Sequence, residues 1–553
     1  MVFYDYDFDP KYSKAVAYFS MEFAIHQALK TYSGGLGFLA GSHMRSAYDL
    51  RQNMVGVGIL WSYGYYDQGR NEDRSMKAEF IRKYYYFLED LGIRATVNIN
   101  GKDVFIKAYY LPPGTFSSAP VIFLSTDIPE NDFLSRTITH KLYDMNEETR
   151  ISQEIVLGIG GVRVLDALGH RAECYHMNEG HALPMVYELY KRYGSHDELR
   201  EHVVFTTHTP EAAGNEEHDI DLLRRFGFFN GLDRETVHQL TGVDMGRFNL
   251  TAGALRASKI TNAVSKIHGE VANRMWSHYE GACRIISITN AQNRRYWTDK
   301  DMLAALDNHE DYALVARKKH LKRMLFNIVA DQTGKVFDPD ILTIVWARRF
   351  AEYKRPGLLK RDFERFRKLL EREDKPIQVI WAGKPYPFDS DAINQFNELI
   401  HISNDFKRMA VLVGYELGLS MTLKKGSDVW LNTPRVSREA SGTSGMSASM
   451  NGSIHFSTDD GWHPEFAIDG INAFTIPPID HSTPINVQDE QDNKNMMDIL
   501  EKQIIPLYYD RPQQWMQIMQ RAMSDVIPAF DSGRMAHEYY EKMYTAEYAC
   551  SLE

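Results

Sequence analysis

The stretch that decides the fold is LTIVWARRFAEYKRP, residues 342–356. Its first part, LTIVWA, is a continuous apolar and β-branched run, which is typical of a strand buried on both faces of a parallel sheet. Its second part places Arg348, Arg349, Lys354 and Arg355 directly after that strand. Cations are costly to bury unless an anion meets them, and arginine together with lysine suits the oxygens of a phosphate. The pattern predicts a phosphate site at the end of this strand, with a charged surface loop as the alternative.

Four further segments of the same kind recur along the chain between helical patterns. They are AVAYFSMEF (15–23), HVVFTTHTP (202–210), PIQVIWAG (376–383) and DVWLNTP (428–434). Strands that alternate with helices in this way predict βα units around parallel sheets, and hence an α/β fold. Because such sheets bind ligands at the carboxyl ends of their strands, the residues just after each apolar run are the first candidates for a site.

The length of 553 residues exceeds what one hydrophobic core usually supports, and it predicts two domains. We place a junction near residue 290, where the β-like run ISITN (286–290) gives way to a long, charged helical stretch. The first predicted domain is therefore 1–290 and the second is 291–494. Residues 495–553 have the pattern of amphipathic helices, which we expect to pack back on the first domain.

The charge balance argues against several classes of partner. The net charge is −11 and no block of lysine and arginine stands out, so neither nucleic acid nor a membrane surface is expected as a partner. The first residues, MVFYDYDFDPKYSK, are acidic and polar, unlike a secretory signal, and no stretch offers about 20 uninterrupted apolar residues. The three cysteines have no metal-ligand spacing. The sequence predicts a cytoplasmic protein without disulfide or zinc site.

Two segments rich in small residues suit ligand binding through backbone amides. TYSGGLGFLAGS (31–42) has three close glycines ahead of a predicted helix, and a tight turn without ligand is the alternative. REASGTSGMSASMNGS (438–453) follows the strand-like DVWLNTP and forms a loop whose amides can point at an anion. Glu439 begins this loop, where its carboxylate can accept hydrogen bonds from sugar hydroxyls. A plain helix cap is the alternative for any single residue.

A fourth segment, YHMNEGHALP (175–184), places His176, Asn178, Glu179 and His181 at another strand end. Two histidines at this spacing can bind a metal, but no third ligand is evident, so no metal site is predicted. Sugar hydroxyls, which need paired donors and acceptors, fit these side chains better. A buried histidine with satisfied hydrogen bonds is the alternative for His176.

These segments, from AYFSMEF near residue 17 to about residue 480, resemble the α-glucan phosphorylase family, and especially its short bacterial branch. The family includes glycogen, maltodextrin and starch phosphorylases. The resemblance implies two Rossmann-like domains that face a central cleft, the GT-B type of glycosyltransferase fold. It also implies a retaining hexosyltransferase of glycogen and maltodextrin metabolism, which converts an α-1,4-glucan and phosphate into glucose 1-phosphate.

The resemblance further implies roles for residues of the predicted first domain. Gly34 and Gly35 match a glycine loop that contacts phosphate and sugar, and Glu22 falls where the family keeps a glutamate near the substrate. His181 corresponds to a catalytic histidine that accepts a hydrogen bond from the donor glucose near the scissile bond. Asn290 corresponds to an asparagine that holds a glucose hydroxyl.

In the predicted second domain, Arg349 and Lys354 resemble the catalytic pair that holds the substrate phosphate and the cofactor phosphate. The family loop that holds glucose and phosphate is matched by Glu439, Ser441, Gly442 and Thr443. That loop continues in the family to a lysine that forms a Schiff base with pyridoxal phosphate, and Ser447 stands at this position here. Because serine cannot form an imine, no covalently bound pyridoxal phosphate is expected. Non-covalent binding of the cofactor stays open, and no metal is expected.

Three functions stay open at this stage. The first is an active phosphorylase that uses an α-glucan or maltooligosaccharide with phosphate. The second is a retaining glucosyltransferase independent of pyridoxal phosphate, with a nucleotide sugar or another sugar phosphate as donor, because the cations persist without the lysine. The third is a non-catalytic glucan-binding or regulatory protein, although a lapsed site has no physical need for buried cations. A homodimer is possible by analogy with the family.

Overall fold

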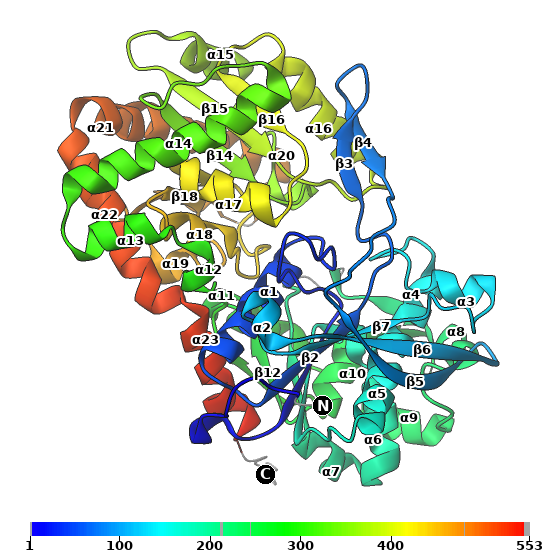
Figure 1. Ribbon diagram of the computed structural model, residues 1–553. Helices are drawn as coiled ribbons and strands as arrows, with labels where there is room; N and C mark the ends of the chain where they lie inside the picture. Colours follow the sequence, from blue (N-terminus) through cyan, green and yellow to red (C-terminus); the bar gives the residue numbers. More distant parts are fainter. Residues whose placement is uncertain (1–2, 211–213, 244, 481, 547–553) are drawn as a thin grey trace. The chain divides into compact units, whose positions relative to one another are not determined.

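The computed structural model describes residues 3–210, 214–243, 245–480 and 482–546. Helices alternate with strands along this part of the chain, and most strand pairs are parallel, so the predicted α/β class is confirmed. The chain divides into two compact units, each built around its own large sheet (Figure 1).

The two units are not consecutive pieces of the sequence. The first unit contains the described residues of Met1–Tyr66, Phe80–Asn290 and Ser532–Glu553, and the second contains those of Asp67–Glu79 and Ala291–Asp531. The longest segment of the first unit, Phe80–Asn290, therefore ends beside the junction that the sequence indicates.

The first unit is built on a nine-stranded sheet in the order β13-β12-β9-β8-β1-β2-β7-β6-β5. The strands from β13 to β7 are parallel to their neighbours, whereas β6 pairs antiparallel with both β7 and β5. Every residue of β1 and β8 is buried. The strands are β1 (Val16–Ser20), β2 (Met54–Ile59), β5 (Glu89–Ile99), β6 (Lys102–Leu111), β7 (Val121–Ser125), β8 (Cys174–Asn178), β9 (Val203–Thr206), β12 (Ile260–Ala263) and β13 (Arg284–Ser287).

The chain of the first unit winds outward from β1 in two directions. β2 and β7 are added on one side, and β8, β9, β12 and β13 then follow on the other side. The loops after β1 and β8 leave adjacent strands at the point where the direction reverses, which is where open α/β sheets bind ligands. Helices of this unit include α1 (Gly35–Asp49), α4 (Glu147–Ile155), α5 (Gly161–Ala167), α6 (Met185–Tyr193), α10 (Leu250–Ala257), α11 (Lys266–Trp276) and α23 (Ser532–Tyr539).

The second unit has a six-stranded, parallel sheet in the order β16-β15-β14-β17-β18-β19. This is the order of a doubly wound Rossmann sheet, whose switch point lies between β14 and β17. β14 is the LTIVWA run, and all its residues are buried, as its composition predicts. The strands are β14 (Leu342–Ala347), β15 (Ile377–Ala382), β16 (Met409–Leu412), β17 (Val429–Asn432), β18 (Ile454–Thr458) and β19 (Ala473–Ile476).

Two helices of the second unit, α14 and α17, pack on this sheet through one buried cluster. Leu325 of α14 and Leu423 of α17 meet Val345, Ile380 and Trp430 of the strands there. This packing holds the ends of β14 and β17 in fixed positions. Helices of the unit include α14 (Asp311–Thr333), α15 (Phe363–Glu371), α16 (Ser390–Ser403), α17 (Leu417–Gly426), α18 (Ser444–Ser449), α20 (Ile485–Ile499), α21 (Ile505–Asp510) and α22 (Pro512–Phe530).

A hairpin from early in the chain also belongs to the second unit. β3 (Asp67–Arg70) and β4 (Met76–Glu79) pair antiparallel and lie beside α16 (Figure 1). The Gln68 side chain joins two loops of that unit, donating to Gly383 O at 2.9 Å and accepting from Gly414 N at 2.9 Å. The first unit therefore lacks this hairpin, although the predicted first domain, 1–290, includes it.

The C-terminal segment 495–553 is divided between the units, although we expected it to pack on the first domain as a whole. Val526 of α22 shares a buried cluster with Met446 of α18 in the second unit. In the first unit α23 packs against α1, where the Ser46 and Ser532 hydroxyls lie 2.5 Å apart. The amphipathic pattern shows that these helices bury one face, but it does not identify the surface that covers it.

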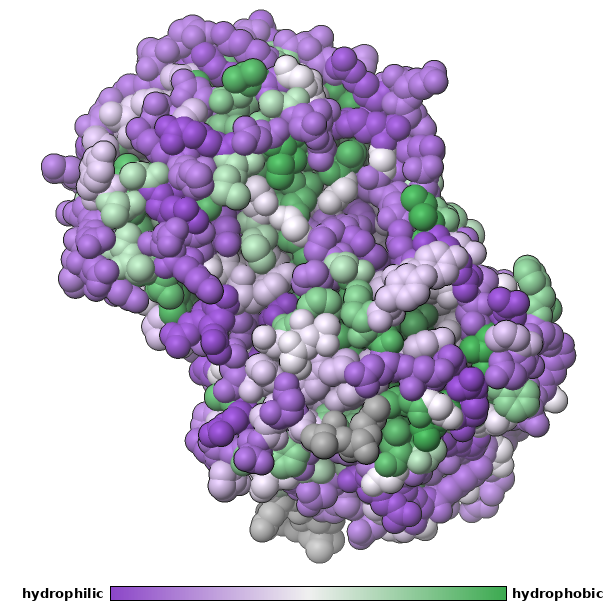
Figure 2. All heavy atoms as spheres, viewed as in Figure 1, coloured by the Kyte–Doolittle hydropathy of each residue, from purple (hydrophilic) through white to green (hydrophobic). Residues whose placement is uncertain are grey.

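The surface in view is mostly hydrophilic, with hydrophobic residues scattered between the polar ones (Figure 2). Within the described ranges no helix has both the length and the apolar character that a membrane span requires. The cytoplasmic location stays a prediction.

Candidate functional site

Glu22 anchors the glycine-rich loop that follows β1 in the first unit. Its carboxylate accepts hydrogen bonds from the Ser33 backbone N–H at 2.7 Å, the Ser33 hydroxyl at 2.9 Å and the Gly34 N–H at 3.1 Å. Tyr143 donates its hydroxyl to the same carboxylate at 2.6 Å. Because Glu22 is only 2% exposed, the carboxylate fixes the shape of its own loop.

Gly34 and Gly35 have open space beside their backbones, unlike Gly37, the next glycine along the chain. A methyl group built at either position meets no atom within 4 Å, so the space beside these backbones is open. The same methyl group at Gly37 would lie 2.5 Å from the Tyr32 Cβ. Gly37 is therefore required for packing, whereas a ligand can approach the backbone at Gly34 and Gly35 where α1 begins.

The loop after β8 is joined to the loop after β9. Glu179 caps the short helix η3 (Gly180–Ala182) and accepts a hydrogen bond from the His208 N–H at 2.9 Å. Burial raises the pKa of Glu179 to about 7. His208 Nε2 lies 2.7 Å from Asn178 Oδ1. His208 has no assigned role in the sequence-based prediction, although its place within HVVFTTHTP, just after the strand β9, is the signal that points to it.

His181 lies on η3, just after β8, close to the switch point between β1 and β8 where the strand order of the first sheet reverses. It is 9% exposed, and burial lowers its pKa to about 4, so the ring is neutral at pH 7. Among the described residues its Nδ1 has no hydrogen-bond partner, and its Nε2 lies 3.8 Å from Glu216 Oε2. The ring of Tyr143, the residue that donates to Glu22, lies 5.9 Å from the His181 ring between centroids. The structure thus brings two predicted residues, Glu22 and His181, to the same tyrosine.

Asn290 follows β13 and ends the long segment of the first unit. Its backbone N–H donates to Val264 O at 2.9 Å. The residue is 4% exposed, and its Oδ1 accepts no hydrogen bond from any residue that the structure describes. A buried acceptor without a donor costs about 1–3 kcal/mol, so this amide oxygen suits a ligand hydroxyl.

The second unit gathers cations around one carboxylate where β14 and β17 adjoin. Lys354 Nζ lies 2.7 Å from Glu439 Oε2, and Arg348 Nη1 lies 3.4 Å from the same oxygen. All three residues are buried. Burial raises the pKa of Glu439, but the charges of Lys354 and Arg348 outweigh it and hold that pKa below its ordinary value. The cations after β14 therefore already meet one anion, and it belongs to the protein itself.

The four cations after β14 do not share one environment, contrary to what their spacing suggests. Arg348 is buried, whereas the next residue, Arg349, is exposed, although its charge also helps to lower the pKa of Glu439. Arg355 turns to another part of the unit and pairs with Asp492 at 2.6 Å. The resemblance implies a role for Arg349, and the structure adds Arg348 to the same cluster.

Asp460 fixes the start of the loop that carries the other predicted residues of this unit. Its carboxylate accepts the Glu439 N–H at 2.8 Å. Ser441 is buried, and its hydroxyl has no hydrogen-bond partner within the described chain. Gly442 has a φ of 86°, a conformation that favours glycine, and both Gly442 and Thr443 are partly exposed. The loop thus offers a buried hydroxyl and accessible backbone beside Glu439.

Ser447 is fully buried on α18 and bonds back to its own helix. Its hydroxyl donates to Ser444 O at 3.3 Å and to Thr443 O at 3.4 Å. A side chain without an amine and without exposed surface does not fit a Schiff base with pyridoxal phosphate. Lys424 of the neighbouring helix α17 is also buried, and its Nζ lies 3.7 Å from the centre of the Trp297 ring.

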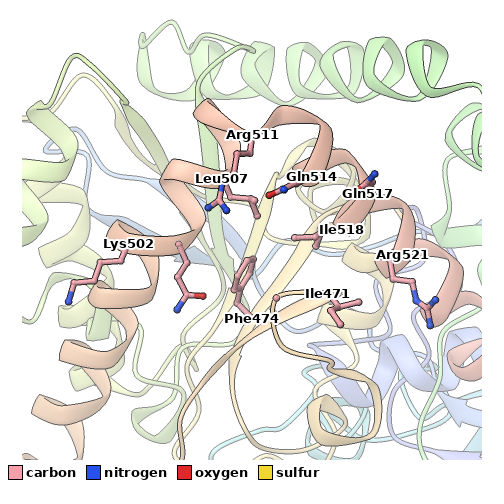
Figure 3. Close-up of a pocket in the computed structure, with 11 residues that line it drawn as sticks. Ile471, Phe474, Lys502, Leu507, Arg511, Gln514, Gln517, Ile518 and Arg521 are labelled. Atoms are coloured by element: carbon pink, nitrogen blue, oxygen red, sulfur yellow. The ribbon is translucent and has the colours of Figure 1, made fainter.

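A separate cavity of about 680 Å³ lies in the second unit, over β19 and the C-terminal helices. Phe474, Leu507 and Ile518 form its apolar part, and Lys502 and Arg521 lie at its two ends (Figure 3). Both cations have partners, since Lys502 pairs with Asp498 and Arg521 with Asp525. None of the predicted site residues lines this cavity.

Comparisons with known proteins agree with the resemblance. A family model described as Phosphorylase, carbohydrate phosphorylase, matches residues 255–469. An uncharacterized protein of Methanocaldococcus jannaschii is 50% identical over 532 residues, which cover 96% of this chain and 100% of the relative. Maltodextrin phosphorylase of Thermococcus litoralis is 30% identical over 605 residues, covering 98% of this chain and 72% of the relative. Glycogen phosphorylase of Aquifex aeolicus is 30% identical over 609 residues, covering 97% and 87%.

Proposed function

Because the chain belongs to the carbohydrate phosphorylase family, we propose that it is a retaining glucosyltransferase that moves glucose from an α-1,4-glucan to phosphate and releases glucose 1-phosphate. The observation that carries the proposal is the cluster of Arg348, Lys354 and Glu439. It lies at the switch point between β14 and β17, the position at which a doubly wound sheet binds its ligand. The relatives named maltodextrin phosphorylase and glycogen phosphorylase support the substrate class.

We assign the substrate phosphate to Arg349 and Lys354. The Lys354 ammonium group has three donors, of which one is directed at Glu439, and the exposed Arg349 guanidinium can hold two phosphate oxygens at once. Arg348 and Lys354 share the single carboxylate of Glu439, which leaves one net positive charge among these three groups. That positive charge favours a phosphate anion, and the fixed cations stabilise the negative charge that develops on it during glucosyl transfer.

We assign glucose hydroxyls to buried polar groups that form no hydrogen bond with any residue in the described part of the chain. In the first unit these are His181 Nδ1 and Asn290 Oδ1, and in the second unit the Ser441 hydroxyl. A neutral histidine can either donate to or accept from a hydroxyl, so the low pKa of His181 favours this role over binding an anion. Backbone approach at Gly34 and Gly35 adds amide contacts without crowding.

We propose that this chain forms no Schiff base with pyridoxal phosphate, because Ser447 is buried and has no amine. The same observation favours a second candidate function, transfer of glucose from a nucleotide sugar. Two arginines and a lysine, Arg348, Arg349 and Lys354, suit a diphosphate as well as a phosphate.

The test is release of glucose 1-phosphate from a maltooligosaccharide and inorganic phosphate, with and without added pyridoxal phosphate. Turnover without the cofactor supports the proposal as stated, and turnover that depends on it shows non-covalent binding. If neither condition gives product, phosphorolysis is excluded, and glucose transfer from nucleotide sugars is measured next. Glucan binding without turnover of any donor would leave only a binding function.

A further inference from the structure

A second polar cluster lies in the first unit, and it has no place in the proposed reaction. Glu154 of α4 faces Glu216 and His218, which lie at the start of β10 (Glu217–Asp219). One ligand atom from each of the three residues can be chosen so that all lie within 4.8 Å of one another. We propose that Glu154, Glu216 and His218 bind a divalent transition-metal ion, although the sequence alone predicts no metal.

The spacing of the three side chains is close to that of a metal site. His218 Nε2 lies 3.3 Å from Glu216 Oε1 and 3.9 Å from Glu154 Oε2. With metal–ligand distances of about 2.0–2.2 Å, neighbouring ligand atoms of a tetrahedral ion lie about 3.3–3.5 Å apart. The Glu154 oxygen would have to move about 0.5 Å closer to Nε2 to reach this spacing.

The environment of Glu154 is a second, independent observation that points to a bound cation. Its side chain is 0% exposed, and neither carboxylate oxygen accepts a hydrogen bond from the described residues. An isolated carboxylate in such a place is strongly disfavoured unless a cation or donor meets it. The nearby cation, Arg150, contacts Glu216 Oε2 instead, which leaves Glu216 Oε1 directed towards His218.

His218 is oriented as metal-binding histidines usually are. Its Nδ1 lies 2.9 Å from Glu147 Oε1, so this carboxylate can accept the ring N–H. That tautomer leaves a lone pair on Nε2, which has no hydrogen-bond partner in the described part of the chain. A carboxylate behind the second ring nitrogen fixes the orientation of the ring and raises its basicity as a ligand.

The charges of the groups that surround the cluster also fit a divalent ion. Three carboxylates, Glu147, Glu154 and Glu216, face one guanidinium, that of Arg150. With the three carboxylates ionised and the His218 ring neutral, as metal binding requires, these groups leave two net negative charges, and a divalent cation neutralises both. Two carboxylates and one imidazole suit Zn²⁺ or Mn²⁺.

Such an ion would join α4 to the segment that begins at Glu216. Since Glu216 Oε2 also lies 3.8 Å from His181 Nε2, the ion would fix the neighbour of a proposed substrate-binding histidine. This consequence rests on the proposed function, whereas metal binding itself does not. The test below therefore uses no activity assay.

Chelator-treated full-length protein is titrated with Zn²⁺ and with Mn²⁺ alone, and bound metal is counted by elemental analysis after gel filtration. We expect one ion per chain and a rise in melting temperature with metal concentration. Glu154→Gln should bind at least about 10-fold more weakly and lose the rise in melting temperature. Glu147→Gln should weaken binding about 10-fold, because it removes only the support of His218.

Glu188→Gln is the matched control, since Glu188 pairs with Arg163 at 2.8 Å elsewhere in the same unit and should leave metal binding unchanged. In metal-free buffer Glu154→Gln should be at least as stable as the parent, which separates loss of the metal from failure to fold. The proposal is overturned if the parent protein binds no stoichiometric ion. It is equally overturned if Glu154→Gln binds as tightly as the parent.

Discussion

The two switch points bury a carboxylate by different means. In the first unit, Glu22 is held by four neutral donors from its own loop and from Tyr143. In the second unit, Glu439 is held by two cations, Lys354 and Arg348. Neutral donors stabilise a loop without adding charge, whereas the cations exceed their partner and leave positive charge to spare. On the assignments proposed above, neutral donors would therefore suit a surface that binds hydroxyls in the first unit, and the cations would suit a surface that binds phosphate in the second.

Lys354→Met removes one of the two cations that hold Glu439 in the second unit, and it should have the largest effect of the variants compared here. It removes the closest partner of Glu439 and one of the two residues assigned to phosphate. We expect the affinity for glucose 1-phosphate, measured by calorimetry, to fall about 100-fold, or about 2.7 kcal/mol. Lys407→Met is the control, because Lys407 lies on the surface of the same unit and pairs with the exposed Glu373. A loss smaller than about 3-fold would show that Lys354 does not contact the phosphate.

Glu22→Ala and Glu22→Gln test the other side of this comparison, in which neutral donors hold the carboxylate of Glu22. The alanine variant leaves the partly buried N–H groups of Ser33 and Gly34 and two hydroxyl donors without their acceptor, so the free energy of unfolding should fall by about 3 kcal/mol. The glutamine variant keeps one oxygen and should lose only about 1 kcal/mol, because the donors are neutral. Urea unfolding measures both. Equal losses in the two variants would mean that the charge of Glu22 matters, and the contrast with Glu439 would disappear.

Much of this arrangement could be predicted from local sequence. β1, β14, β15 and β17 are mostly apolar runs, and a parallel strand buried on both faces leaves that pattern in any context. Lys354 and Glu439 were found because they follow such runs, and the carboxyl ends of neighbouring strands meet at one edge.

The features that were missed depend on contacts between distant residues. The hairpin of β3 and β4 joins the second unit through Gln68, whose partners Gly383 and Gly414 lie more than 300 positions away. Arg348 and Arg355 are the same residue type after the same strand, yet only Arg348 reaches Glu439. Arg355 has a φ of 49°, so the chain turns there and directs its side chain to Asp492. No local pattern encodes that turn.

Glu179→Gln extends the comparison to pH dependence. Burial raises the pKa of Glu179 from 4.5 to about 7, so the folded protein binds this proton more tightly than the unfolded chain does. Its contribution to stability is therefore full below about pH 4.5 and is lost as the pH rises through 7. Glutamine cannot ionise, so the variant should gain about 2 kcal/mol relative to the parent between pH 5 and pH 8.

Urea unfolding at pH 5, 6, 7 and 8 measures this difference, and Glu439→Gln is the matched control. The pKa of Glu439 is lowered, because Lys354 and Arg348 outweigh the effect of burial. Its contribution is present above the pKa of the unfolded state and is lost only as the pH falls further, so that control should show a flat difference from pH 5 to pH 8. A flat profile for Glu179→Gln as well would show that Glu179 is already ionised in the folded state.

Ser447→Ala should have the smallest effect. It tests whether ligand binding at the switch point of the second unit needs the Ser447 hydroxyl. The lost hydroxyl bonds only to its own helix, and alanine has the better helix propensity, so we expect the stability to change by less than about 1 kcal/mol. Affinity for glucose 1-phosphate should stay within about 2-fold. Ser441→Ala, which removes a buried hydroxyl that has no hydrogen-bond partner among the described residues, should weaken that affinity about 5-fold. If Ser447→Ala instead weakened binding more than Ser441→Ala, the ligand would have to contact α18 itself, and the cations around Glu439 would no longer suffice to explain phosphate binding.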